Sequence, residues 1–318
     1  MAEDNNAPVR ATPTEFLVAP PKTPADRGSR ALVLGGGGSA GNAWEIGVIA
    51  GLFEAGLDLT EADLIIGTSA GATVAAQITS APPPELLAAI LAEAPTRTGP
   101  AGSDSGGLRG RSVADHMDRT SRIIAAAANP ADMRRKMGEA ALELDAASDG
   151  AWSARWCGIV AARLATPRWP ARGVRITAVD AVTGEPVVFD RLSGVDLVDA
   201  VAASTSASLP YRITDRLYID GGYRRNENAD LAAGCERVLV LSPFGGRTRH
   251  PLEWGMQLAV QVDELRSRGS TVETVFPDAH ALAAFGSNMM DLSARPLAAR
   301  AGCAQGRALA EQLTPFWG

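Results

Sequence analysis

A serine between two glycines is the first place in this chain where residue types and spacing indicate chemistry. Ser69 is the centre of the pentapeptide 67–71, Gly-Thr-Ser-Ala-Gly, which follows an apolar run over 63–66. A serine on a sharp turn from a strand into a helix presents its hydroxyl at the end of a sheet as a nucleophile. The flanking Gly67 and Gly71 are expected because a Cβ on either side would not fit so tight a turn. The alternative is a structural turn, because the pentapeptide pattern alone is weak.

A glycine-rich loop follows the first expected strand, which covers residues 30–34. An activated serine needs donors for the oxyanion that forms when it attacks a carbonyl carbon. The loop opens a helix, so its backbone N–H groups are free and carry the positive end of the helix dipole. The loop residues that we expect to bind the oxyanion are Gly36, Gly37 and Gly38.

The same loop also fits a dinucleotide-binding pattern, because Gly36, Gly38 and Gly41 have the spacing G-x-G-x-x-G. That interpretation needs an acidic residue at the carboxyl end of the second strand. Asp58 has a suitable spacing but precedes that strand, which places it at the wrong edge of the sheet. We therefore keep dinucleotide binding only as a minor alternative.

The usual general base for an activated serine is a histidine, but Asp220 is the better candidate in this chain. Asp220 ends a short expected strand and precedes Gly221 and Gly222, which puts its carboxylate at the same sheet edge as the serine. Asp-Gly is also a common turn pair, so a purely structural Asp220 remains open. A triad of Ser69, Asp220 and either His250 or His280 fits the residue order of α/β-hydrolases, but that fold normally has several strands before its serine, and only one is expected here. The three histidines of the chain are His116, His250 and His280.

Composition excludes several classes of protein. The 318 residues are 46% hydrophobic and 21% charged, which predicts a sizeable packed core. The net charge of −6 argues against a general nucleic-acid binder. Three widely spaced cysteines predict neither a disulfide framework nor a metal site, so a reducing compartment and no metal are expected.

We expect a cytoplasmic protein that can lie at the periphery of a membrane. No apolar run reaches the roughly 20 residues needed to cross a bilayer. The acidic residues Glu3 and Asp4 and the lack of an apolar run argue against a secretory leader. Membrane contact is a hypothesis based on tryptophan near arginine, a pairing favoured at the membrane surface. The alternative is that the tryptophans pack on the core. The residues concerned are Trp152, Trp156 and Trp169, with Arg155, Arg163, Arg168 and Arg172.

Strands that alternate with helices predict an α/β fold, with a mainly parallel central sheet and helices on both faces. We expect a disordered, proline-rich tail over 1–28 and one domain over 29–318. Within the domain, a helical cap is expected over about 82–170, and a C-terminal strand and helices over 246–318. A loop rich in Gly, Ser and Pro is expected over 96–110.

Three motifs in this order resemble the patatin-like phospholipase family: the glycine loop, the Gly-x-Ser-x-Gly turn and Asp220-Gly221-Gly222. The segments 183–185 and 202–210 also look like those of the family, and the resemblance covers about residues 30–245. It implies a three-layer α/β sandwich and hydrolysis of lipid acyl esters without metal or cofactor. Ser69 would be the nucleophile and Asp220 the general base of a two-residue catalytic dyad.

One position departs from the family pattern, because Ala40 stands where the family commonly has Arg or Lys. The missing charge raises a second hypothesis, a catalytically silent lipid-binding or regulatory relative.

Overall fold

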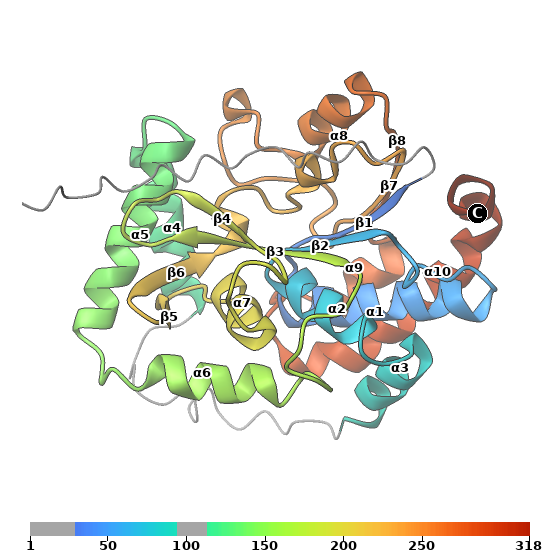
Figure 1. Ribbon diagram of the computed structural model, residues 1–318, viewed down its shortest axis with the longest axis horizontal. Coiled ribbons are helices and arrows are strands. Elements are labelled where there is room, and N and C mark those ends of the chain that lie inside the picture. Colours follow the sequence, from blue (N-terminus) through green and yellow to red (C-terminus); the bar gives the residue numbers. More distant parts are fainter. Residues whose placement is uncertain (1–28, 94–112) are drawn as a thin grey trace, which may run out of the picture.

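The computed structural model describes residues 29–93 and 113–318 (Figure 1). The tail expected over 1–28 and the loop expected over 96–110 lie outside the described residues. The strands are β1 (Arg30–Leu34), β2 (Leu64–Gly67), β3 (Gly173–Asp180), β4 (Pro186–Phe189), β5 (Tyr211–Ile213), β6 (Arg216–Asp220), β7 (Arg237–Leu241) and β8 (Thr271–Val275). The α-helices are α1 (Gly38–Glu54), α2 (Ala70–Ile78), α3 (Pro83–Ala92), α4 (Val113–Ala126), α5 (Pro130–Ala146), α6 (Trp152–Ala161), α7 (Leu197–Ser204), α8 (Leu258–Ser267), α9 (Ala279–Phe285) and α10 (Arg295–Trp317).

The described strands form one mixed sheet in the order β5-β6-β3-β2-β1-β7-β8, with β4 paired to β3. The five strands from β3 to β8 in this order are parallel to their neighbours. The pairs β3–β4, β3–β6 and β5–β6 are antiparallel. The expected fold class, a mainly parallel sheet between helices, is therefore confirmed.

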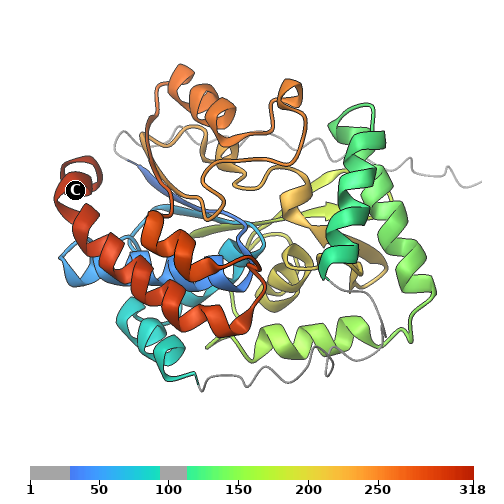
Figure 2. The same cartoon turned by 180° about the vertical axis from the view of Figure 1, so that it is seen from behind.

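Helices cover both faces of the sheet, with α8 on one face and α1, α2, α7 and α10 on the other (Figures 1 and 2). The alternating side chains of β1 show why both faces must be covered. Leu32 and Leu34 belong to the core under α1, whereas Ala31 and Val33 belong to the core under α8. A strand buried on both faces is apolar throughout, which is how the run 30–34 looks in the sequence.

Helix α10 packs against α1 at unusually close range, because small residues face backbone in both helices. A Cβ on Gly47 would lie 2.2 Å from the Ala299 carbonyl oxygen, and one on Gly302 would lie 2.4 Å from the Trp44 carbonyl oxygen. Glycine allows two helix backbones to approach in this way. The two helices run in the same direction, so the start of α10 lies beside the start of α1.

Most elements match the sequence expectations, and the differences have local causes. The described part of the segment 82–170 contains α3, α4, α5 and α6 and no strand, as expected. Among the helices expected over 246–318, the apolar pattern of residues 252–268 predicts one continuous helix, and this was wrong in its first part, because Gly255 has φ 63° and interrupts the helix before α8. The short strand β5 was not expected. No helix in the described residues is long and apolar enough to cross a membrane.

Candidate active site

Ser69 lies on the turn between β2 and α2, in a strained backbone conformation with φ 52° and ψ −115°. Few non-glycine residues adopt positive φ, and such residues cluster at functional sites. The turn lies directly on β1, since the Gly71 N–H donates to the Gly35 carbonyl at 3.1 Å. A Cβ on Gly71 would lie 2.1 Å from the Leu34 carbonyl oxygen. The expectation that the glycines are required by a tight turn is therefore confirmed for this position.

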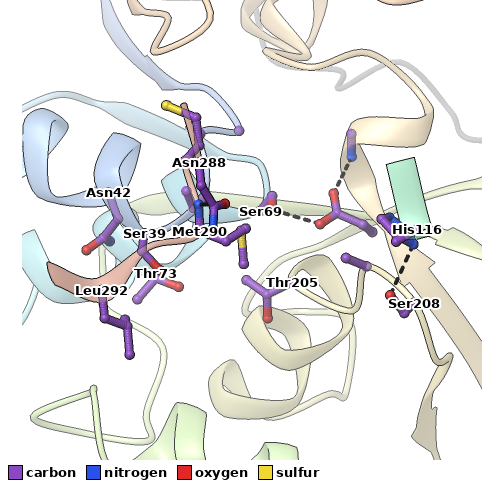
Figure 3. Close-up of a pocket in the computed structure, with 18 of the residues that line it drawn as sticks. Ser39, Asn42, Ser69, Thr73, His116, Thr205, Ser208, Asn288, Met290 and Leu292 are labelled. Carbon is purple, nitrogen blue, oxygen red and sulfur yellow. Dashed lines mark hydrogen bonds between the residues drawn. The ribbon is translucent and has the colours of Figure 1, made fainter. Parts of the chain in front are cut away.

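The Ser69 hydroxyl donates a hydrogen bond of 2.7 Å to Oδ2 of Asp220. The second carboxylate oxygen, Oδ1, accepts the Gly222 N–H at 2.7 Å (Figure 3). The carboxylate is thus held from one side by its own turn and offers its other oxygen to the serine. This is the hydrogen-bonded pair of nucleophile and base that nucleophilic catalysis needs.

Asp220 reaches the serine although its strand runs against the main direction of the sheet. The carboxyl end of an antiparallel strand would ordinarily lie at the opposite edge. However, the part of β3 that pairs with β6 is only its end, residues 178–180. Asp220 is opposite Ala178, two residues beyond Ile176, which is opposite the last residue of β2, Gly67. The overhang of β3 therefore brings the end of β6 level with Ser69.

Burial raises the pKa of Asp220 from its usual range to about 6, while the hydrogen bonds from Ser69 and Gly222 act in the opposite direction. Removing a carboxylate from water disfavours its charged form, which makes it a stronger base. At neutral pH the group is still ionised and able to accept the serine proton.

The glycine loop is less open than expected. The Gly36 N–H donates to the Asn226 carbonyl at 3.0 Å, so this group is not free to bind an oxyanion. Within the described residues the N–H groups of Gly37 and Gly38 make no hydrogen bond. Gly38 has φ 61°, and a Cβ there would lie 2.8 Å from the Met289 carbonyl oxygen. Of the three expected donors, only the N–H groups of Gly37 and Gly38 are available. Glycine is required at position 38, because of its positive φ and the contact that a Cβ would make.

Three polar residues that the sequence interpretation missed hold these parts together. Asn226 accepts from Gly36 and also donates through Nδ2 to the Gly36 carbonyl at 3.3 Å. Asn228, fully buried, donates to the Thr68 hydroxyl at 3.0 Å. Ser204 accepts the Ser69 N–H at 2.9 Å. The sequence did offer one clue to the roles of Asn226 and Asn228, because two asparagines follow Asp220 within eight residues.

The histidines do not form a triad with the serine. His116 lines the same pocket, but its Nδ1 lies 3.1 Å from the Ser208 hydroxyl (Figure 3). His250 lines the pocket as well, and its Nδ1 lies 2.8 Å from the Thr248 hydroxyl. Burial lowers the pKa of His250 to about 4, with the charge of Arg249 acting in the same direction.

The dinucleotide alternative finds no support in the geometry. Asp58 precedes β2 and accepts hydrogen bonds from the backbone and hydroxyl of Thr60 in its own turn. The start of α1 is covered, since the Ala40 N–H donates to the Met289 carbonyl at 3.0 Å. Across residues 29–93 and 113–318, no group of three or more His, Cys, Asp or Glu side chains is arranged to hold a metal ion.

Ser69 and Asp220 open into a large pocket of about 2200 Å³. Figure 3 shows Ser39, Asn42 and Thr73 on one side of Ser69, with Met290 and Leu292 nearby. The apolar part of the lining includes side chains from α3, α4, α6 and the segment before α10. These are Leu86, Ile90, Ile124, Trp152, Trp156, Ile159, Met289, Met290 and Leu292. A mostly apolar cavity with a few converging polar groups suits an acyl chain beside a reacting ester.

The tryptophans considered for membrane contact make contacts inside the protein. Trp152 and Trp156 are stacked with ring centroids 5.9 Å apart. The Trp156 indole N–H donates to the Ala202 carbonyl at 3.2 Å, and that of Trp169 donates to the Val195 carbonyl at 2.7 Å. All three pack against the main core. These contacts favour the packing interpretation.

The fold and the site define an α/β protein with a mainly parallel sheet. A serine at the carboxyl edge of this sheet donates a hydrogen bond to a carboxylate. A family model described as patatin-like phospholipase matches residues 32–233, more than half of the chain. The chain therefore belongs to the patatin-like phospholipase family. A comparison with curated proteins finds no match. The matched segment contains Ser69, Asp220 and the glycine loop, and it ends before β7.

Proposed function

We propose that this protein hydrolyses acyl esters of lipids through Ser69 as nucleophile and Asp220 as general base. Family membership supports lipid acyl hydrolysis in general. The observation that carries the specific proposal is the 2.7 Å hydrogen bond from the Ser69 hydroxyl to the Asp220 carboxylate. Strain at the serine, burial of the aspartate and the adjoining apolar pocket support it further.

In this mechanism Asp220 accepts the Ser69 proton while Oγ attacks the ester carbonyl carbon. The resulting oxyanion is stabilised by the N–H groups of Gly37 and Gly38, each donor contributing roughly 2.7–4 kcal/mol to barrier lowering. Asp220 then protonates the departing alcohol, which leaves an acyl group on the serine. Water attacks this acyl-enzyme with its proton passing to Asp220, and the carboxylic acid leaves as the serine recovers its proton.

A fluorophosphonate probe and an ester assay test the proposal together. We expect Ser69→Ala to abolish covalent labelling and ester hydrolysis, and Asp220→Asn to lower both by at least about 10²-fold. The matched control is Ser80→Ala, because among the described residues the Ser80 hydroxyl, just past the end of α2, donates only to carbonyls of that helix, at 2.9 Å from that of Ala76. Hydrolysis retained by either active-site variant would contradict the dyad. A wild-type protein that neither labels nor hydrolyses esters would favour the silent lipid-binding relative.

A further inference from the structure

The pocket around Ser69 is positively charged, although the whole chain carries a net charge of −6. Its described lining includes seven arginines but only three acidic residues, Glu93, Asp115 and Asp220. A low-dielectric cleft lined by one sign of charge concentrates ligands of the opposite sign. Two of the arginines, Arg163 and Arg295, lie on the side of the pocket where α1 and α10 begin. Their surroundings indicate what this excess of charge binds.

Arg295 is held at the start of α10 with its guanidinium inside the pocket. Its Nε lies 3.0 Å from a carboxylate oxygen of Glu93, and Nη1 donates to Oδ1 of Asn42 at 2.9 Å. Nη1 also lies 3.3 Å from the Ser39 carbonyl oxygen. The close packing of α10 on α1 brings this residue to the glycine loop from outside the segment that matches the family.

Arg163 follows the end of α6 and has no carboxylate partner among the described residues. Its guanidinium lies over the Trp156 ring, 5.5 Å from the centroid. The pKa of Arg163 is lowered, first by partial burial in the pocket and then by the charge of Arg295, while Glu93 opposes the shift. Two guanidinium groups thus share one nearby carboxylate, which leaves a positive charge uncompensated.

Further hydrogen-bond donors face the same region. Asn42 is only 6% exposed and lines the pocket, yet its Nδ2 has no acceptor among the described residues. The hydroxyls of Ser39 and Thr73 lie between Asn42 and Ser69 in Figure 3. An unsatisfied buried amide is costly, so it indicates a missing acceptor. Guanidinium, amide and hydroxyl groups together form a site for an oxyanion with several acceptor oxygens.

We infer that Arg163, Arg295 and Asn42 bind the phosphate of an anionic lipid headgroup while the acyl ester of the same lipid lies at Ser69. This inference rests on the proposed function, because it assigns the headgroup side of that substrate. Thr73 lies one helical turn after Ser69, in the first turn of α2, and lines the same pocket as Asn42, so the site is within reach of a headgroup attached near the scissile ester. A substrate with an uncharged headgroup would leave the guanidinium charge and the Asn42 amide unpaired.

A structural role for Arg163 is the competing explanation, because cations near a helix C-terminus stabilise the helix. A purely structural arginine would affect stability without distinguishing between lipids. The test therefore measures binding selectivity, in full-length Ser69→Ala protein so that no lipid is consumed. The probes are oleoyl lysophosphatidic acid and monooleoylglycerol, which share an acyl chain and a glycerol ester and differ in the phosphate. Both are titrated below their aggregation concentrations by calorimetry.

We expect the phosphorylated lipid to bind at least about tenfold more tightly than the neutral one. Adding Arg163→Gln should remove most of this preference, with little change in affinity for monooleoylglycerol. The matched control is Arg155→Gln, an arginine that lines the same pocket from α6 but pairs with Asp149 at 3.0 Å. This control should keep the preference.

Equal binding of the two lipids would overturn the inference, as would a preference that survives Arg163→Gln or is lost equally in Arg155→Gln. Inorganic phosphate binding as tightly as the lipid would show a free-phosphate site and overturn the headgroup assignment. The readout does not require catalysis, so a failure of the proposed hydrolysis remains distinguishable. In that case the Arg163-dependent preference would persist in a wild-type protein that does not react with fluorophosphonate.

Discussion

The backbone N–H of Ser69 donates a hydrogen bond of 2.9 Å to the hydroxyl of Ser204, at the end of α7. Ser204 is fully buried, so water does not compete for this bond. The bond ties the strained serine turn to a helix that follows it by 135 residues. Ser204 therefore acts as a positioning residue for the proposed nucleophile.

Replacing Ser204 by Ala should lower both stability and activity. The variant leaves the N–H of half-buried Ser69 without this partner, which costs about 1 kcal/mol. Chemical unfolding and the rate of fluorophosphonate labelling measure the two effects. Restoring the hydroxyl with Ser204→Thr should recover part of the labelling rate. Labelling at the wild-type rate in Ser204→Ala would contradict the positioning role.

The pKa of Asp220 predicts how activity depends on pH. Because burial raises that pKa to about 6, the carboxylate is protonated below this pH and cannot accept the serine proton. The labelling rate of Ser69 should be half-maximal near pH 6 and fall about tenfold per unit at lower pH. Circular dichroism at each pH separates this loss from unfolding. A rate that stays constant down to about pH 4 would argue against Asp220 as the base.

Replacing Gly38 by Ala should destabilise the protein by about 2 kcal/mol or more and abolish ester hydrolysis. Its φ of 61° is unfavourable for alanine, and the new Cβ would collide with the Met289 carbonyl oxygen. The control is Gly269→Ala, since Gly269 has φ 92° but nothing within 4 Å of an added Cβ. That control should cost about 1 kcal/mol of stability and leave hydrolysis unchanged. Similar losses in both variants would contradict a role of the loop in the site.

A buried carboxyl beneath the glycine loop predicts a pH-dependent stability. Glu45 is fully buried, and no hydrogen bond of ordinary geometry reaches either carboxyl oxygen from the described residues, although the Gly35 N–H lies near enough to favour the charged form. Burial raises the pKa of Glu45 well above its usual range; the Gly35 N–H opposes this shift, and the charge of Glu227 adds to it. The protonated carboxyl therefore stabilises the folded protein fully below the unfolded pKa of about 4.3, and this contribution is lost as pH rises.

Replacing Glu45 by Gln mimics the protonated form at every pH. The variant should exceed the wild type in free energy of unfolding by about 1 kcal/mol or more at pH 8, and the difference should shrink toward pH 4. Urea unfolding at several pH values measures both quantities. The exposed residue Glu253 provides the control variant Glu253→Gln, which should show no such trend. A difference independent of pH would rule out ionisation of Glu45 as its cause.

The sequence alone was sufficient to predict the local elements of the candidate site. The turn around Ser69 and the glycine loop are readable because tight turns and close backbone contacts impose their residue types over a few positions. The apolar runs over 30–34 and 63–66 predicted strands for a different local reason. A strand that is buried on both faces has no polar side, so its whole run is apolar. The alternation of these elements then predicted the fold class.

Tertiary structure decided which of these groups meet and which are free. The overhang of β3 brings Asp220 to Ser69 from an antiparallel strand, and no local pattern around residue 220 encodes that overhang. The Asn226 carbonyl accepts the Gly36 N–H although the two residues are 190 positions apart in the sequence. The packing of α10 places Arg295 beside the start of α1. Contacts of this kind depend on how whole elements pack. A linear sequence shows the type of each donor and acceptor, whereas only the packed chain determines which partner each one finds.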